Sequence, residues 1–178
     1  MEEKKSIRGE VRRRIKLMTD EAKQTAAHTI FEAIEATAEF RNAECIALFA
    51  AMRDEVPTDE ALERCRVYGK RVVVPRVEGD IMRYYPYSPD EMTEGAFGIM
   101  EPMGDKEVKP SAIDLMIVPA RAFTPRGERL GRGGGFYDKY MSNSEFRATK
   151  FGIAFSCQIF DTLPTDPHDI AVDRLFWA

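Results

Sequence analysis

Short apolar runs, separated by segments with helical patterns, constrain the fold of this chain more than any other feature. The runs at 45–50, 72–74, 113–118 and 151–155 are almost continuously apolar. Strands that are buried on both faces of a sheet have this character. Helical patterns precede and separate the runs, and this order of helices and strands is typical of α/β domains with a parallel sheet.

Apolar spacing and end signals predict the helices. Residues 3–18 carry apolar side chains at the spacing of one helix face. Thr19 is a typical N-cap of a second helix, and a third helix is expected from Thr58 to Gly69. The other expected elements are an alternating strand at 81–87 that is more exposed than the apolar runs, a long loop at 86–110, a short helix at 136–141 and an edge strand at 174–177. We therefore expect residues 1–178 to form a single three-layer, Rossmann-like α/β domain with a largely parallel central sheet.

A cluster of glycines between arginines is the clearest functional signal. Residues 129–138 read RLGRGGGFYD. Glycine costs conformational entropy in an ordered element, so this density indicates a backbone that approaches a ligand closely. Arg129 and Arg132 indicate that the ligand is anionic, and a phosphate chain fits best. Consecutive amides leading into the helix at 136–141 would add donors, and Asp138 could hold a divalent cation beside the phosphates.

Two common phosphate-binding motifs are excluded. A P-loop requires a second glycine followed by lysine and a hydroxyl residue, but Arg71 follows the Gly69-Lys70 pair. In a dinucleotide fingerprint that starts at Gly131, Phe136 would occupy the last glycine position. A flexible glycine turn and an arginine–glycine RNA-binding tail are simpler interpretations. The flanking arginines and aromatics weigh against the first, and the single occurrence in a folded region weighs against the second.

Composition bounds the class of function. The net charge of −4 does not suggest nucleic-acid binding. Basic residues nevertheless gather in residues 1–20 and at Arg121, Arg126, Arg129 and Arg132, which suggests a small anionic ligand. Three widely spaced cysteines without a Cys-x-x-Cys pair give no support to a zinc site or a redox dithiol. No signal peptide or membrane-length apolar run is visible, so we expect a cytoplasmic protein with no membrane partner.

Several motifs, in their order and spacing, resemble one known family. RLGRGGGFYDKY at 129–140 is the most specific of them. The others are Lys4–Arg8, Met52–Glu55, Gly98–Pro102, Asp114–Pro119, Leu163–Asp169 and Val172-Asp173. Together they resemble the 5-formyltetrahydrofolate cyclo-ligase family, also called methenyltetrahydrofolate synthetase, over nearly the whole chain. The chain departs from the family pattern at Gly134, where some members carry lysine, at Ala120 and Thr124, and at Arg121, which is an added charge.

The resemblance implies an ATP- and Mg²⁺-dependent ring closure. Members of the family convert 5-formyltetrahydrofolate and ATP into 5,10-methenyltetrahydrofolate, ADP and phosphate. The formyl group is an amide, so its carbon is a poor electrophile and its oxygen a poor leaving group. Phosphorylation of the oxygen by ATP activates the carbon, N10 attacks, and phosphate departs. The implied partner is 5-formyltetrahydrofolate, with or without a polyglutamate tail, and the implied assembly is a monomer or a weak homodimer.

The resemblance also assigns roles to individual residues. The ATP-binding residues would be Lys4, Lys5, Arg8, Arg129, Gly131, Arg132, Gly133, Gly134, Gly135, Phe136 and Tyr137. The folate-binding residues would be Ala50, Met52, Glu55, Phe97, Arg132, Gly133, Gly134, Gly135 and Phe136. Arg132 and Tyr137 would be catalytic, with Arg132 stabilising charge on the transferred phosphoryl group. Asp138 and Asp169 would bind Mg²⁺, which prefers carboxylate oxygens.

Other functions and simpler roles stay open at this point. A non-catalytic module that binds a phosphorylated metabolite could use the same loop, as could an ATP-dependent enzyme for another heterocycle. A nucleic-acid-binding domain is disfavoured by the acidic net charge. For single residues, Glu55 could be a solvated loop acid, Phe97 could serve in packing, Asp169 could cap a turn and His168 could be a hydrogen-bonding loop residue.

Overall fold

The computed structural model describes residues 1–178 and is built on a six-stranded sheet in the order β10-β9-β6-β1-β2-β3. The strands are β1 (Cys45–Ala47), β2 (Arg71–Glu78), β3 (Ile81–Pro86), β6 (Leu115–Val118), β9 (Thr149–Ala154) and β10 (Arg174–Trp177). Neighbouring strands are parallel except β2 and β3, which form an antiparallel hairpin. The largely parallel sheet expected from the sequence is therefore confirmed.

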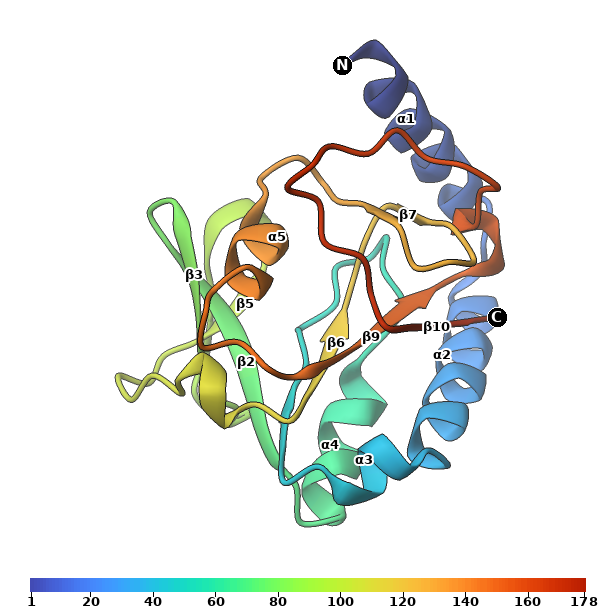
Figure 1. The fold of residues 1–178 in the computed structure, drawn as a ribbon. Coiled ribbons are helices and arrows are strands. Elements are labelled where there is room, and N and C mark those ends of the chain that lie inside the picture. The colour runs from blue at the N-terminus through green and yellow to red at the C-terminus, as the bar shows by residue number, and fades with distance from the viewer.

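Helices cover both faces of this sheet, as Figure 1 shows. They are α1 (Glu2–Lys16), α2 (Asp20–Glu35), α3 (Ala38–Asn42), α4 (Asp59–Val67) and α5 (Phe136–Met141). Side chains alternate along the central strands, so Ile46 packs with α1, α2 and α4, whereas Cys45 and Ala47 pack with α5 on the opposite face. The layer that contains α5 is the thinner one. The three-layer α/β architecture predicted from the sequence is confirmed.

Most predicted elements occur close to their expected positions. The Thr19 side chain accepts a hydrogen bond from the Ala22 amide at 3.1 Å, so it caps α2 as predicted. The first helix ends at Lys16 and the first strand at Ala47, each earlier than the apolar pattern indicated. The apolar run continues past β1 because Leu48 and Phe49 remain buried after the chain has left the strand.

The long loop expected at 86–110 is the main error of the sequence analysis. The segment contains a hairpin of β4 (Met92–Glu94) and β5 (Met100–Pro102), and the 3₁₀ helix η1 (Ala96–Gly98) lies between the two strands. Strands of three residues are too short to show an alternating pattern. The Glu101 carboxylate accepts a hydrogen bond from the Val77 amide at 2.6 Å, which fastens the hairpin to β2.

The other short elements also lack a readable pattern. They are β7 (Ala122–Phe123), β8 (Arg129–Leu130), the 3₁₀ helix η2 (Pro110–Ala112) and the 3₁₀ helix η3 (Ser156–Gln158). The strands β7 and β8 pair as an antiparallel ribbon. This ribbon carries the chain from the end of β6 into the glycine-rich segment, so it positions that segment beside the sheet.

Thr58 ties the loop after β1 to the start of α4. Its buried hydroxyl donates to the Phe49 carbonyl at 2.6 Å and accepts from the Ala51 amide at 3.0 Å. Replacing Thr58 with valine keeps the shape but leaves both backbone groups unpaired, so we expect the free energy of unfolding to fall by about 2–4 kcal/mol. Urea denaturation measures this change. Thr93 is exposed, so Thr93→Val is the matched control. Equal stability of the two variants would contradict a stabilising role for the two Thr58 hydrogen bonds.

Candidate active site

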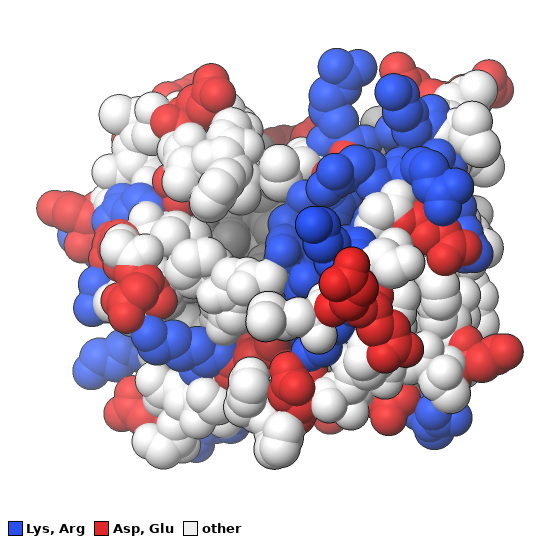
Figure 2. Space-filling view, turned by 90° about the horizontal axis from the view of Figure 1, so that it is seen from above, with Lys and Arg blue, Asp and Glu red and all other residues white.

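A cavity of about 420 Å³ lies where the loops that follow β1 and β6 meet the glycine-rich segment. This is the carboxyl end of the parallel strands, where ligands bind in open α/β sheets. Figure 2 shows a hollow in this face of the molecule, with lysine and arginine side chains gathered along one side of it. Among the cavity-lining residues, the cations are Lys4, Arg8, Arg129 and Arg132. The cavity is therefore suited to an anionic group.

The glycine-rich loop, residues 131–135, forms part of the cavity wall with a backbone that only glycine adopts easily. Gly133 and Gly135 have φ angles of 114° and 69°, in the region that disfavours other residues. A side chain on Gly134 would meet the Phe136 ring at 2.7 Å. The Arg8 side chain donates to the Gly131 carbonyl at 2.8 Å, so α1 holds the loop from the other side.

The N-terminal helix brings one lysine into the cavity. Lys4 Nζ lies 2.6 Å from Asp166 Oδ2 and 3.6 Å from Asp169 Oδ2. The hydrogen bond to Asp166 raises the pKa of Lys4 and lowers that of Asp166, so both groups stay charged. Lys5, also predicted to bind ATP, is exposed and does not line the cavity.

Arg129 and Asp138 form a largely buried ion pair beside the cavity. Arg129 Nη1 lies 2.8 Å from Asp138 Oδ1, and the two side chains are 4% and 17% exposed. The Ile170 amide donates to the same carboxylate oxygen at 3.0 Å. The Arg129 guanidinium also lies 5.7 Å from the centre of the Tyr137 ring. Asp138, a predicted Mg²⁺ ligand, thus neutralises Arg129 and anchors the C-terminal segment.

Asp169, the other predicted metal ligand, belongs to a different group of side chains. Ligand atoms of Asp166, His168 and Asp169 all lie within 4.8 Å of one another, and Asp138 is outside this group. The two carboxylates suit Mg²⁺, which prefers hard oxygen ligands, whereas imidazole suits it less. Sequence reasoning missed Asp166. Its spacing of three residues from Asp169, within one turn, was the available signal.

Arg132 and Glu55, both predicted site residues, contact each other. Arg132 Nη2 lies 3.0 Å from Glu55 Oε1 and 2.5 Å from Asp54 Oδ1. The other oxygen of Glu55 accepts from the Met52 amide at 2.8 Å, which fixes its orientation. Tyr137, predicted to be catalytic, lines the cavity, and burial raises the pKa of its phenol far above the usual range. Tyr137 therefore stays protonated and can donate a hydrogen bond.

The other half of the cavity is mostly apolar. Of the residues predicted to bind folate, Ala50 and Met52 line this half, whereas Phe97 is 83% exposed and does not line the cavity. Residues that the sequence analysis did not assign complete this half: Pro75, Val77, Met82, Ile99 and Glu101. The Gly98–Pro102 motif pointed to this region. The contribution of β2 and β3 could not be read from the sequence, because the hairpin geometry decides it.

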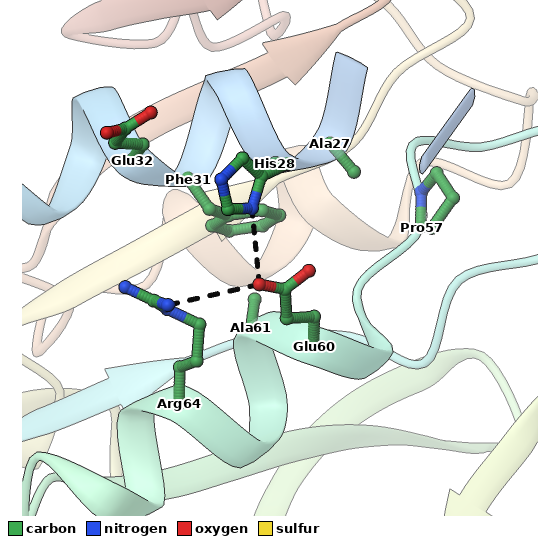
Figure 3. A pocket seen from close by; sticks show the side chains of 8 residues that line it. All are labelled: Ala27, His28, Phe31, Glu32, Pro57, Glu60, Ala61 and Arg64. Carbon is green, nitrogen blue, oxygen red and sulfur yellow. Dashed lines mark hydrogen bonds and ion pairs between the residues drawn. The ribbon is translucent and has the colours of Figure 1, made fainter. Parts of the chain in front are cut away.

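A second, much smaller pocket lies between α2 and α4 (Figure 3). His28 Nδ1 lies 3.2 Å from Glu60 Oε1, and Arg64 Nη1 lies 3.9 Å from the same oxygen. The pocket encloses about 10 Å³, which is room for about one water molecule. It is thus too small to compete with the main cavity as a ligand site.

No helix of the chain has the length and apolar character needed to cross a membrane.

The fold and the cavity together define an α/β protein that can hold an anionic group beside a flat apolar one. A sequence model of the 5-formyltetrahydrofolate cyclo-ligase family matches residues 1–177. The chain therefore belongs to this family and is an enzyme of the ligase class. The resemblance found in the sequence motifs is confirmed.

Individual relatives agree with this assignment. The mouse 5-formyltetrahydrofolate cyclo-ligase is 27% identical over 98% of this chain and 93% of its own length. The Escherichia coli K12 enzyme of the same name is 34% identical over 72% of this chain and 74% of its own length. The NMR structure of 5,10-methenyltetrahydrofolate synthetase from Aquifex aeolicus superposes with a TM-score of 0.86 at 31% identity, covering 98% of this chain and 89% of that one.

Proposed function

We propose that this enzyme converts 5-formyltetrahydrofolate and ATP into 5,10-methenyltetrahydrofolate, ADP and phosphate in the presence of Mg²⁺. One observation carries the proposal. A single cavity joins a cationic half, formed by α1 and the glycine-rich loop, to a mostly apolar half formed by β2, β3 and the loop after β1. Such a cavity can hold a polyphosphate chain next to a pterin ring. Every residue that the family resemblance assigned to ATP or folate lines the cavity except Lys5 and Phe97.

In the cationic half the protein mainly positions charge. Phosphoryl transfer needs aligned reactants and neutralised phosphate oxygens rather than covalent help from the protein. Lys4 and Arg8 line the cavity from α1, and the glycines at 131–135 would let a phosphate approach the backbone closely. Arg132 is the cation nearest to Glu55, at the border between the halves. There it would stabilise the phosphoryl group as it moves to the formyl oxygen.

In the apolar half the protein orients the folate. The rings would pack against Met52 and the apolar residues of the two hairpins. Protonated Tyr137 can donate a hydrogen bond, and a side-chain oxygen of Glu55 can accept one from N10–H or from the pterin. Once the formyl oxygen carries the phosphoryl group, N10 forms the new C–N bond, its proton passes to Glu55 or to water, and the C–O bond to phosphate breaks.

The residues beside the cationic half also fit Mg²⁺. Asp166 and Asp169 present carboxylate oxygens next to Lys4 and would hold the ion. The bound ion would neutralise phosphate charge. Asp138, the second acid predicted from the family resemblance, has one oxygen committed to Arg129 and to the Ile170 amide. Its role as a metal ligand stays a prediction.

Absorbance at the methenyl-folate band tests the proposal directly. Purified enzyme is mixed with 5-formyltetrahydrofolate, ATP and Mg²⁺, and we expect the band to grow. Growth should stop when ATP is omitted or when a chelator removes Mg²⁺. A flat trace from folded protein that still binds ATP would reject the folate substrate and favour another heterocycle. A flat trace from folded protein that does not bind ATP would reject the whole proposal.

A further inference from the structure

Arg121 is a buried charge that the proposed reaction does not use. It immediately precedes β7, and its side chain is only 6% exposed. One guanidinium nitrogen, Nη2, lies 2.5 Å from Asp54 Oδ2, whereas Nη1 is buried without a hydrogen-bond partner. Burying a guanidinium costs free energy even when it is paired. The residue is also an added charge relative to the family motif, so it calls for an explanation in this chain.

Arg121 is one end of a chain of alternating charges that reaches the cavity. Asp54 contacts Arg121 through Oδ2 and Arg132 through Oδ1, both at 2.5 Å. Arg132 in turn contacts Glu55 at 3.0 Å. The four groups are electrically neutral together, and Asp54 is 29% exposed. This network, Arg121–Asp54–Arg132–Glu55, connects the ribbon before the glycine-rich loop to the loop after β1.

Asp54 is shared between two cations, and its ionisation depends on both. Burial alone would raise the pKa of Asp54, but hydrogen bonds and charges from Arg132 and Arg121 outweigh burial and lower it. Arg121 experiences the opposite balance, because burial and the neighbouring charge of Arg132 lower its pKa. An arginine stays protonated in proteins even so. Asp54 therefore remains a carboxylate that needs at least one cation beside it.

We infer that Arg121 is a positioning residue that acts through Asp54 and frees Arg132 to bind phosphate. This inference rests on the proposed function, in which Arg132 contacts the transferred phosphoryl group. When Arg132 moves from Asp54 to a phosphate, Arg121 stays on Asp54 and keeps that half-buried carboxylate paired. Without Arg121, each such movement would leave Asp54 without a cation. Arg132 would then be held on Asp54 more tightly and would bind phosphate more weakly.

Two variants test the inference. Arg121→Met removes the buried charge but keeps much of the volume, and we expect the dissociation constant of ATP in Mg²⁺ to rise about tenfold, the scale of one charged hydrogen bond. Asp54→Asn/Arg121→Met removes both charges, so only Glu55 holds Arg132, and ATP affinity should return to the wild-type value or better. Arg126→Met is the matched control, because that arginine is 66% exposed and pairs only with Glu128.

Calorimetric titration with ATP measures the affinities, and thermal unfolding of each variant shows that it is folded. A purely structural role would lower the melting temperature of Arg121→Met, and its loss of ATP affinity would not be reversed by Asp54→Asn. The inference is overturned if Arg121→Met binds ATP as tightly as the wild type, or if the double variant binds as weakly as Arg121→Met. If Arg121→Met does not fold, the double variant decides: affinity at or above wild type supports the inference, and weaker binding overturns it.

The failure of the inference can be told from the failure of the proposed function. Wild-type protein that neither binds ATP nor forms the methenyl product rejects the proposed function, and the inference falls with it. Wild-type protein that does both, alongside an unaffected Arg121→Met variant, rejects only the inference. Kinetics add a further distinction, since Arg121→Met should raise the KM for ATP while the KM for the folate stays unchanged.

Discussion

Replacing Arg132 with alanine is expected to lower kcat by about two to three orders of magnitude, the usual cost of removing a group that stabilises transition-state charge. Arg132 is 35% exposed, and Asp54 keeps its contact with Arg121 when Arg132 is removed. The variant should therefore fold normally. Initial rates of methenyl-folate formation at saturating ATP and folate measure the effect, and thermal unfolding checks the fold.

A matched control separates the role of Arg132 from general loss of positive charge near the cavity. Arg126 lies in the turn between β7 and β8, does not line the cavity and pairs only with Glu128. Arg126→Ala should keep kcat close to the wild-type value. If Arg132→Ala raises only the KM for ATP and leaves kcat intact, Arg132 contributes to binding of ATP and not to the transition state.

The sheet could be predicted from the sequence because its central strands are buried on both faces. Apolar runs as short as 113–118 and 151–155 favour buried strands, and β6 lies within the first run while β9, at 149–154, overlaps the second. The hairpin of β4 and β5 could not be predicted. Its six residues are intermediate or exposed except Glu101 and Pro102, so no apolar pattern marks them. Long-range contacts such as that of Glu101 with the Val77 amide place it.

Part of the candidate site could likewise be predicted from the sequence, and part could not. The glycine-rich loop could be identified because dense glycines indicate a backbone that approaches a ligand closely and the arginines indicate that the ligand is anionic. The structure places this loop in the cavity wall. The partners of the charged residues could not be identified. Nothing in the sequence shows that Asp54 lies between Arg121 and Arg132, because Asp54 is 78 positions away from Arg132 along the chain and only the fold brings the two segments together. The family resemblance alone predicts a folate contact for Phe97, which the structure shows with a φ angle of 61° and 83% exposure.

Replacing Asp138 with alanine is expected to lower the free energy of unfolding by about 3–5 kcal/mol even when no Mg²⁺ is present. The reason is that Arg129, whose side chain is 4% exposed, would lose its counter-ion, and breaking one partner of a buried pair carries a cost of this size. The Ile170 amide would lose its acceptor as well. Urea denaturation in a chelating buffer measures the change without any contribution from a bound metal.

Two further variants separate the ion pair from a metal role. Arg129→Met/Asp138→Ala removes both charges and should recover much of the lost stability, because no unpaired charge stays buried. Activity should not recover with it, since Arg129 lines the cationic half of the cavity. Asp169→Ala is the comparison for metal binding: its stability in chelator should change less, whereas the Mg²⁺ concentration needed for activity should rise. If Asp138→Ala is as stable as the wild type in chelator, the carboxylate does not serve chiefly as the counter-ion of Arg129, and its predicted role as a Mg²⁺ ligand becomes the better explanation.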